Sequence, residues 1–149
     1  MQGIYFGIML VMILYNLFIY LSVRERSYLY YIIYISTFTL FQASIQGFSF
    51  EYLWPNSTTW ANTSIPFLGV LSLFFASLFA RSILQTNSLT PKFDKGLVLI
   101  ALSLFLTLPL VIFADYDIGM VAALFCTFIF FNFVFLIACL TALTGNRTA

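Results

Sequence analysis

The sequence predicts an all-α fold, a polytopic bundle of transmembrane helices, and two observations support this. The first is composition: 62% of the 149 residues are hydrophobic, 7% are charged, and the mean hydropathy is +1.04. Soluble domains carry roughly 25% charged residues, which keep their surfaces in water. Six basic and five acidic side chains cannot cover a water-exposed surface of this size. Lipid must therefore be the solvent for most of it.

The second observation is the length of the apolar runs. A helix needs about 20 apolar residues to cross the hydrocarbon core of a bilayer, and the chain divides into segments of that length. These segments do not alternate polar and apolar residues as barrel strands do, so their backbone groups must be satisfied within helices. We predict five spans, at residues 2–23, 28–50, 64–85, 96–114 and 118–143.

Short polar segments separate the predicted spans. The first connection reads VRERS and the last reads DYD, while Asn, Pro and Ser residues typical of turns interrupt the second and third. Connections this short require neighbouring helices to run antiparallel. Pro66 is expected in the first turn of the third span, where its missing N–H costs little, and Pro109 is expected to kink the fourth.

The distribution of charge predicts which end of the bundle faces the cytoplasm. All six basic residues fall on one side of the predicted bundle, and cytoplasmic loops are enriched in Lys and Arg. Glu51, Asp115 and Asp117 fall on the other side. We therefore predict an outside N-terminus and a cytoplasmic C-terminus. The residues that set this topology are Arg24, Arg26, Arg81, Lys92, Lys95 and Arg147.

The residues that usually carry catalysis or bind metals form no recognisable pattern. The sequence has no His, and Cys126 and Cys139 lie in one apolar run without the spacing of a metal site. It also lacks a paired nucleophile and base, paired carboxylates and a glycine-rich phosphate loop. A net charge of +1 gives no field that would attract nucleic acid. We expect no enzymatic activity, no catalytic residue, no metal or cofactor and no nucleic-acid partner.

Uncharged polar residues at helical spacing are the candidate site residues. Two interpretations of these side chains remain open. They line a pocket between the first two helices that binds a ligand, or they form hydrogen bonds between helices worth about 0.6–2 kcal/mol per pair. Asn132 stands alone among Phe residues of the fifth span, where a buried helix contact is the simpler interpretation. The candidates are Asn16 and Tyr20 in the first span, Thr39, Gln42 and Gln46 in the second, and Asn132.

Small residues suggest where helices approach each other closely. Gly3 and Gly7 share one face of the first span, and a second stripe on the third span contains Gly69 and Ser72. Such faces serve either packing inside the bundle or the formation of a receptor homodimer. The sequence leaves both alternatives open.

An ordered series of motifs near the N-terminus resembles a known family. The series contains Tyr15-Asn16, the turn RERSYLYY at residues 24–31, Phe41-Gln42, Gly47 and the exit YLWP at residues 52–55. In this order and spacing they resemble the membrane domain of bacterial seven-transmembrane receptors with diverse intracellular signalling modules. The motifs cover about a third of the chain, while the helix layout fits its whole length.

The resemblance implies a function that composition and spacing alone do not. Receptors of this family have a sensory domain outside the inner membrane, then seven helices, then a cytoplasmic output module. Residues 1–149 would be the N-terminal five-helix portion of such a domain, multi-pass in a bacterial inner membrane and relaying a periplasmic signal to the cytoplasm. Its partners would be the lipid bilayer, the remaining receptor helices, the upstream periplasmic sensor domain and the downstream signalling module. The alternatives are a small structural or assembly membrane protein and a transporter subunit, which would need polar lining across several helices.

Overall fold

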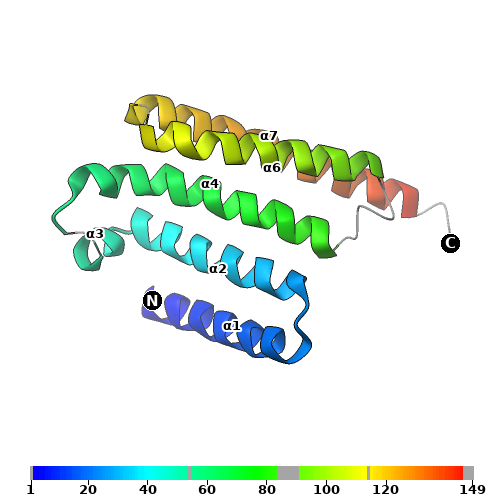
Figure 1. Ribbon diagram of the computed structural model, residues 1–149, viewed down its shortest axis with the longest axis horizontal. Helices are drawn as coiled ribbons and strands as arrows, with labels where there is room; N and C mark the ends of the chain where they lie inside the picture. The colour runs from blue at the N-terminus through cyan, green and yellow to red at the C-terminus, as the bar shows by residue number, and fades with distance from the viewer. Residues whose placement is uncertain (1, 54, 84–90, 114, 146–149) are drawn as a thin grey trace.

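The computed structural model describes residues 2–53, 55–83, 91–113 and 115–145, which are almost entirely helical (Figure 1). No strand occurs among these residues, and the predicted all-α fold is confirmed. Four of the helices are long and apolar enough to cross a membrane, in agreement with a polytopic bundle. The helices are α1 (Gln2–Val23), α2 (Arg26–Ile45), α3 (Phe48–Tyr52), α4 (Thr58–Ile83), α6 (Pro91–Phe113) and α7 (Tyr116–Gly145).

The five long helices lie side by side, and successive ones run antiparallel (Figure 1). Helix α4 is the central element, because it contacts α2 on one side and both α6 and α7 on the other. Helix α1 packs along α2, and its Phe6 ring also meets Phe48 of α3. The helix order across the molecule is therefore α1, α2, α4 and then the pair α6 and α7.

The candidate membrane spans lie in α1, α4, α6 and α7. Helix α2 is not among them, because Tyr, Ser, Thr and Gln side chains interrupt its apolar residues. Its 20 residues still measure about 30 Å at 1.5 Å per residue, and it lies between α1 and α4 (Figure 1). The number of five spans, and the side of the membrane that each end faces, stay predictions.

The second predicted span is divided in the structure. Helix α2 ends at Ile45, and Gly47 follows with a φ of 82°, in the left-handed region that glycine adopts without steric cost. The residues after Gly47 form α3, whose Phe48 ring packs edge-on against Phe6 of α1 with centroids 5.8 Å apart. An apolar run that appears continuous in sequence thus becomes a separate short helix at this end of the bundle.

The expectation that Pro66 falls in a first helical turn is wrong. Helix α4 begins at Thr58 and passes through Pro66, which is buried inside it. The amide of Ala61 donates to the Ser57 carbonyl at 3.0 Å, so the helix starts well before its apolar run. Hydropathy identifies the part of a helix that can lie in lipid, and polar turns can extend it beyond that part. Trp54, Arg147 and residues 84, 85 and 114 of the predicted spans lie outside the described residues.

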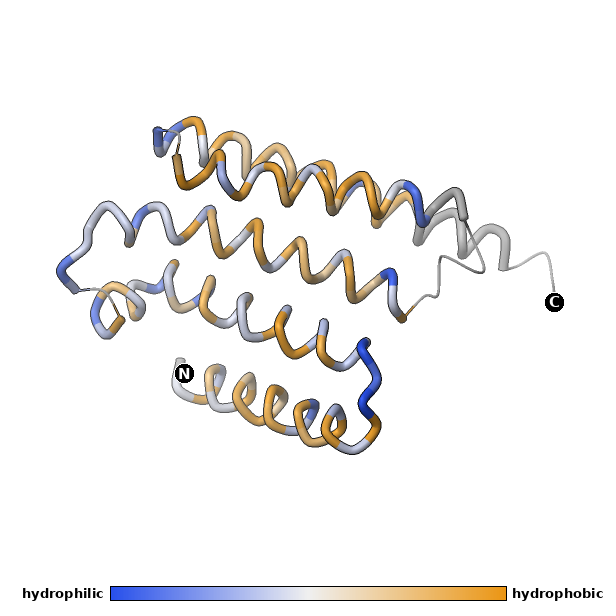
Figure 2. Tube along the Cα trace, viewed as in Figure 1, coloured by the Kyte–Doolittle hydropathy of each residue, from blue (hydrophilic) through white to orange (hydrophobic). Residues whose placement is uncertain are grey.

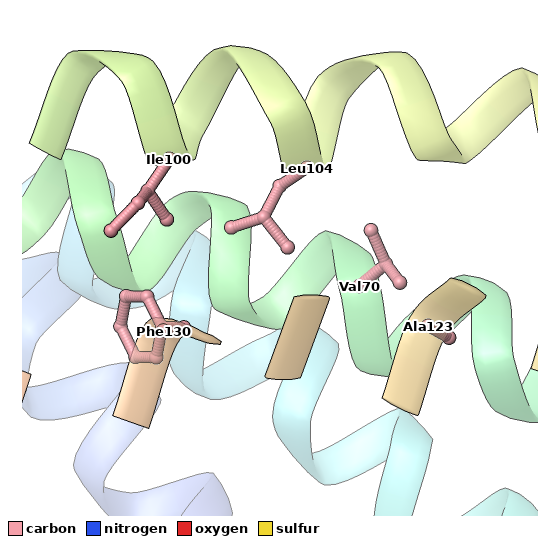
Figure 3. Packing of buried hydrophobic residues seen from close by; sticks show 5 residues of the cluster. All are labelled: Val70, Ile100, Leu104, Ala123 and Phe130. Atoms are coloured by element: carbon pink, nitrogen blue, oxygen red, sulfur yellow. The ribbon is translucent and has the colours of Figure 1, made fainter. Parts of the chain in front are cut away.

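The core lies where α4, α6 and α7 meet. Ile100 and Leu104 of α6 point toward Val70 of α4 and toward Phe130 of α7 (Figure 3), and Leu104 has no exposed surface. Many large apolar side chains elsewhere are exposed, particularly along α1, α6 and α7. A surface of this kind is stable in lipid and not in water. The chain is therefore a multi-pass membrane protein.

Of the two predicted small-residue faces, only one packs against a neighbouring described helix. A Cβ atom on Gly69 would lie 3.2 Å from the ring of Phe41, so this glycine permits α2 and α4 to approach closely. By contrast, no atom of the described chain lies within 4 Å of a Cβ added to Gly3 or Gly7. The Gly3 and Gly7 face takes no part in packing among the described helices, and its use in a homodimer stays a prediction.

Candidate functional site

Most described basic residues gather at one end of the bundle, where α1 turns into α2, α4 ends and α6 begins (Figures 1 and 2). Arg24 lies in the turn between α1 and α2 and has a φ of 55°. Its amide donates to the Tyr20 carbonyl at 2.7 Å. Lys92 lies in the first turn of α6, and Lys95 is exposed one turn further on. We call this the basic end.

An ion pair joins two helices at the basic end. Arg81 in the last turn of α4 donates from Nε to Oδ1 of Asp94 at 2.6 Å and from Nη2 to Oδ2 at 3.0 Å. The side chain of Asp94 is 10% exposed and that of Arg81 is 40% exposed. Asp94 lies in the first turn of α6, so each charge also has the sign that its own helix terminus favours.

A second polar contact joins α4 to α2 beside this ion pair. The hydroxyls of Ser27 and Ser82 lie 2.8 Å apart, and Ser27 also donates to Oε1 of Glu25 at 3.1 Å. Because a Ser hydroxyl has one hydrogen, Ser82 is the donor to Ser27 in this arrangement. We call Glu25, Ser27, Arg81, Ser82 and Asp94 the polar cluster, through which the end of α4 is tied to both neighbours.

The sequence indicated Arg81 only as a topology-setting charge, and it gave no role to Asp94, Ser27 or Ser82. A signal was present: Arg81 and Asp94 carry opposite charges on either side of one short connection. Antiparallel helices bring the end of one beside the start of the next, which places such charges within reach. The serines had no comparable signal, because their meeting depends on how far α2 and α4 slide along each other.

The predicted pocket between the first two helices is only partly present. A cavity of about 280 Å³ lies between α1, α2 and α4 at the basic end, and Asn16 lines it. Tyr20, Thr39, Gln42 and Gln46 do not line this cavity. The remaining lining residues are Glu25, Ser27, Tyr28, Tyr31, Phe79, Ser82 and Ile83.

Three of the candidate side chains bond to their own helix. Asn16 donates to the Met12 carbonyl at 2.8 Å, and Thr39 donates to the Ile35 carbonyl at 2.7 Å. Asn132 is exposed and donates to the carbonyl one turn before it at 2.8 Å, so it is not a buried contact with a neighbouring helix. These groups satisfy themselves locally, as Ser, Thr and Asn often do within helices.

The other candidates occupy different surroundings. Tyr20 and Gln42 are half-buried, and Gln46 is exposed where α2 ends. The polar side chains that α2 does bury are Ser27 and Ser44, at its two ends. The buried polar groups of α2 are therefore small hydroxyls, while the longer amides of the predicted stripe are half-buried or exposed.

A second cavity, of about 360 Å³, lies at the opposite end of the bundle. Ser44 donates there to the Ser49 hydroxyl at 3.1 Å, which fastens α3 to the end of α2. The residues that line this cavity are Ser44, Gly47, Ser49, Phe50, Thr58, Ala61, Asn62 and Ile65, and none of them is charged.

Comparison with protein families places this geometry in a known context. A family model described as 7TM diverse intracellular signalling matches residues 1–149. The match covers the polar cluster, both cavities and every described helix. Comparison with curated proteins and with solved structures found no significant match.

Proposed function

Because the chain belongs to the 7TM diverse intracellular signalling family, we propose that it relays a periplasmic signal to a cytoplasmic output module. It is part of a multi-pass membrane sensory receptor, which the family match and the apolar helices support together. In this proposal the membrane is a bacterial inner membrane, and the basic end faces the cytoplasm. The chain transmits a change of helix arrangement and performs no catalysis of its own.

The single observation that carries the proposal is the attachment of α4 at the basic end. Ser82 of α4 bonds to Ser27 of α2, and Arg81 beside it holds Asp94 of α6. A displacement of α2 along or around α4 would strain the contact between Ser27 and Ser82. If the end of α4 follows, the ion pair between Arg81 and Asp94 carries the change to α6. Hydrogen bonds between membrane helices are worth about 0.6–2 kcal/mol each, weak enough to exchange during signalling.

The order of the helices gives the signal a direction. Helix α1 packs along α2 and touches α3 through the rings of Phe6 and Phe48, so motion imposed on α1 can pass to the bundle through α2. Helix α2 in turn packs against α4, which contacts α6 and α7. Two discrete arrangements of such packed helices are a common basis of switching, because tightly packed interfaces do not deform continuously.

A cysteine pair at the polar cluster tests the proposal. Ser27→Cys with Ser82→Cys, introduced into the full-length receptor after Cys126→Ala and Cys139→Ala, should form a disulfide on oxidation and hold α2 against α4. We expect oxidation to fix the activity of the output module and abolish its response. Reduction should restore the response. The measurement is output activity in membrane vesicles before and after each treatment.

The matched control is Ser44→Cys with Ser49→Cys, whose native hydroxyls are a similar 3.1 Å apart at the opposite end. This pair connects α2 to α3 and leaves the contact between α2 and α4 free at the basic end. Oxidation of the control pair should leave the response intact. A normal response from receptors that carry a complete disulfide between positions 27 and 82 would overturn the proposed relay.

A further inference from the structure

A third cavity, of about 340 Å³, opens at the basic end between α2 and α4. It is separate from the Asn16-lined cavity, although the two share Ser82. Its volume falls at the lower end of the range typical of small-molecule sites. Arg26 and Tyr30 of α2 line it together with Leu78, Arg81 and Ser82 of α4. We call it the arginine cavity.

The two arginines retain donors for a ligand. Arg26 is exposed and forms no ion pair with any residue that the structure describes. Asp94 engages Nε and one hydrogen of Nη2 on Arg81, which leaves three of the five guanidinium N–H donors unengaged by the described chain. Tyr30, whose hydroxyl can also donate, lines the same cavity.

The nearby charges favour anion binding in the arginine cavity more than in the Asn16-lined cavity. Glu25 lines the Asn16-lined cavity but not the arginine cavity. The positive N-terminus of α2 lies beside the negative C-terminus of α4, so the two helix dipoles oppose each other. Asp94 offsets much of the charge of Arg81, so Arg26 gives the cavity its net positive sign. Guanidinium groups match the geometry of phosphate oxygens, which they bind through paired hydrogen bonds.

The depth of the arginine cavity matches that of lipid headgroups. Arg26 is the first residue of α2, and Arg81 lies in the last turn of the candidate span Thr58–Ile83. Tyr30 lies one turn further in, about 6 Å along the helix axis. The cavity thus begins where the hydrocarbon core ends and is bounded on its inner side by Leu78.

We propose that the arginine cavity binds a phosphate group, presented by the headgroup of an anionic phospholipid at the edge of the bilayer. Arg26 and Arg81 hold the phosphate oxygens, and the acyl chains lie along the apolar surface of α2 and α4. The site shares Arg81 and Ser82 with the contacts proposed for the relay, but lipid binding is a separate proposal. Its function does not require that α4 move.

The test measures lipid binding to the purified full chain in a neutral detergent by native mass spectrometry. The probes are phosphatidylglycerol, which is anionic, and phosphatidylcholine with the same acyl chains, whose choline cation offsets its phosphate. At about 0.15 M salt, charges more than about 8 Å apart are screened, so the measurement reports direct contacts. We expect phosphatidylglycerol to bind about fivefold or more tightly than phosphatidylcholine, since each nearby basic residue contributes about fivefold.

The matched variants are Arg26→Gln and Arg24→Gln. Both remove one positive charge from the same turn, but only Arg26 lines the arginine cavity. Arg26→Gln should weaken phosphatidylglycerol binding about fivefold, and Arg24→Gln should change it less than about twofold. The double variant Arg81→Gln with Asp94→Asn, which removes both charges of the ion pair together, should lose the same preference. Equal losses in the two single variants, or equal binding of the two lipids, would overturn the site.

A further arm separates lipid phosphate from soluble phosphate. Millimolar inorganic phosphate is added to the lipid-free chain, and the thermal unfolding temperature is measured for the wild type and for Arg26→Gln. We expect little stabilisation, because a free ion lacks the anchoring of acyl chains. Stabilisation equal to that of phosphatidylglycerol, and lost in Arg26→Gln, would keep the phosphate site and overturn its lipid source.

Discussion

The ring of Phe133 in α7 occupies the space that a Cβ atom would take on Gly96 of α6. Any residue larger than glycine must therefore displace the ring or push the helices apart. We expect Gly96→Ala to destabilise the bundle by about 1–3 kcal/mol, the usual cost of overpacking. Thermal unfolding in detergent measures this loss.

The control for this substitution is Gly3→Ala, because the space around Gly3 is open in the described chain. It should leave stability unchanged or raise it slightly, since Ala favours helix more than Gly does. The double variant Gly96→Ala with Phe133→Leu should recover part of the loss. Equal unfolding temperatures for Gly96→Ala and the wild type would contradict the close packing of α6 on α7.

The ion pair between Arg81 and Asp94 predicts strongly non-additive mutations. Arg81→Gln removes the partner of a carboxylate that is 10% exposed, and we expect a cost of about 1–3 kcal/mol. Because Arg81 is 40% exposed, water compensates for part of the loss when Asp94 is changed instead. Arg81→Gln with Asp94→Asn should cost less than the sum of the single changes. A double-mutant cycle on unfolding free energies measures the difference, and additive costs would argue against a direct pair.

Removing one partner of the contact between Ser27 and Ser82 should also lower stability, but by less than the loss of Arg81. Ser27→Ala removes a hydrogen bond between α2 and α4 and should cost about 0.5–1.5 kcal/mol. The matched control is Ser77→Ala, because Ser77 is also buried but donates to the Phe74 carbonyl of its own helix at 2.7 Å. Its loss should be nearly neutral. If both variants unfold at one temperature, the contact between the two helices contributes no stability.

The predicted orientation can be read from chemical labelling. A single cysteine introduced by Arg24→Cys, in a chain with Cys126→Ala and Cys139→Ala, should react with a membrane-impermeant maleimide only after the cells are permeabilised. The corresponding cysteine from Ser57→Cys, at the opposite end of the bundle, should react in intact cells. The reverse pattern would place the basic end outside and contradict the positive-inside assignment.

Hydropathy and helical length predicted most of the fold, because every helix that crosses the hydrocarbon core needs about 20 mostly apolar residues. The apolar runs that form α1, α6 and α7 were found this way. The end of α2 was not predicted by hydropathy, because Phe48 and Phe50 continue the apolar pattern beyond Gly47. A glycine within such a run is compatible with both a helix and a turn, and only its φ of 82° decides between them.

Less of the candidate site could be predicted. Helical periodicity placed Thr39 and Gln42 on one face, yet it could not tell whether that face meets α4 or lies at its edge. The contacts of the polar cluster depend on the relative shift of neighbouring helices, which composition and periodicity do not encode. The arrangement of basic residues was predicted better, because it requires only that successive helices run antiparallel.

The isolation of α1 has a consequence for biogenesis. It is synthesised before the other described helices, yet it packs mainly against α2, and none of its described residues is buried. Its high hydropathy allows it to remain in the bilayer as an independent helix until α2 is inserted. The residues that form the core appear later in synthesis, from Val70 to Phe130. We therefore expect assembly to begin among α4, α6 and α7, with α1 docking after them.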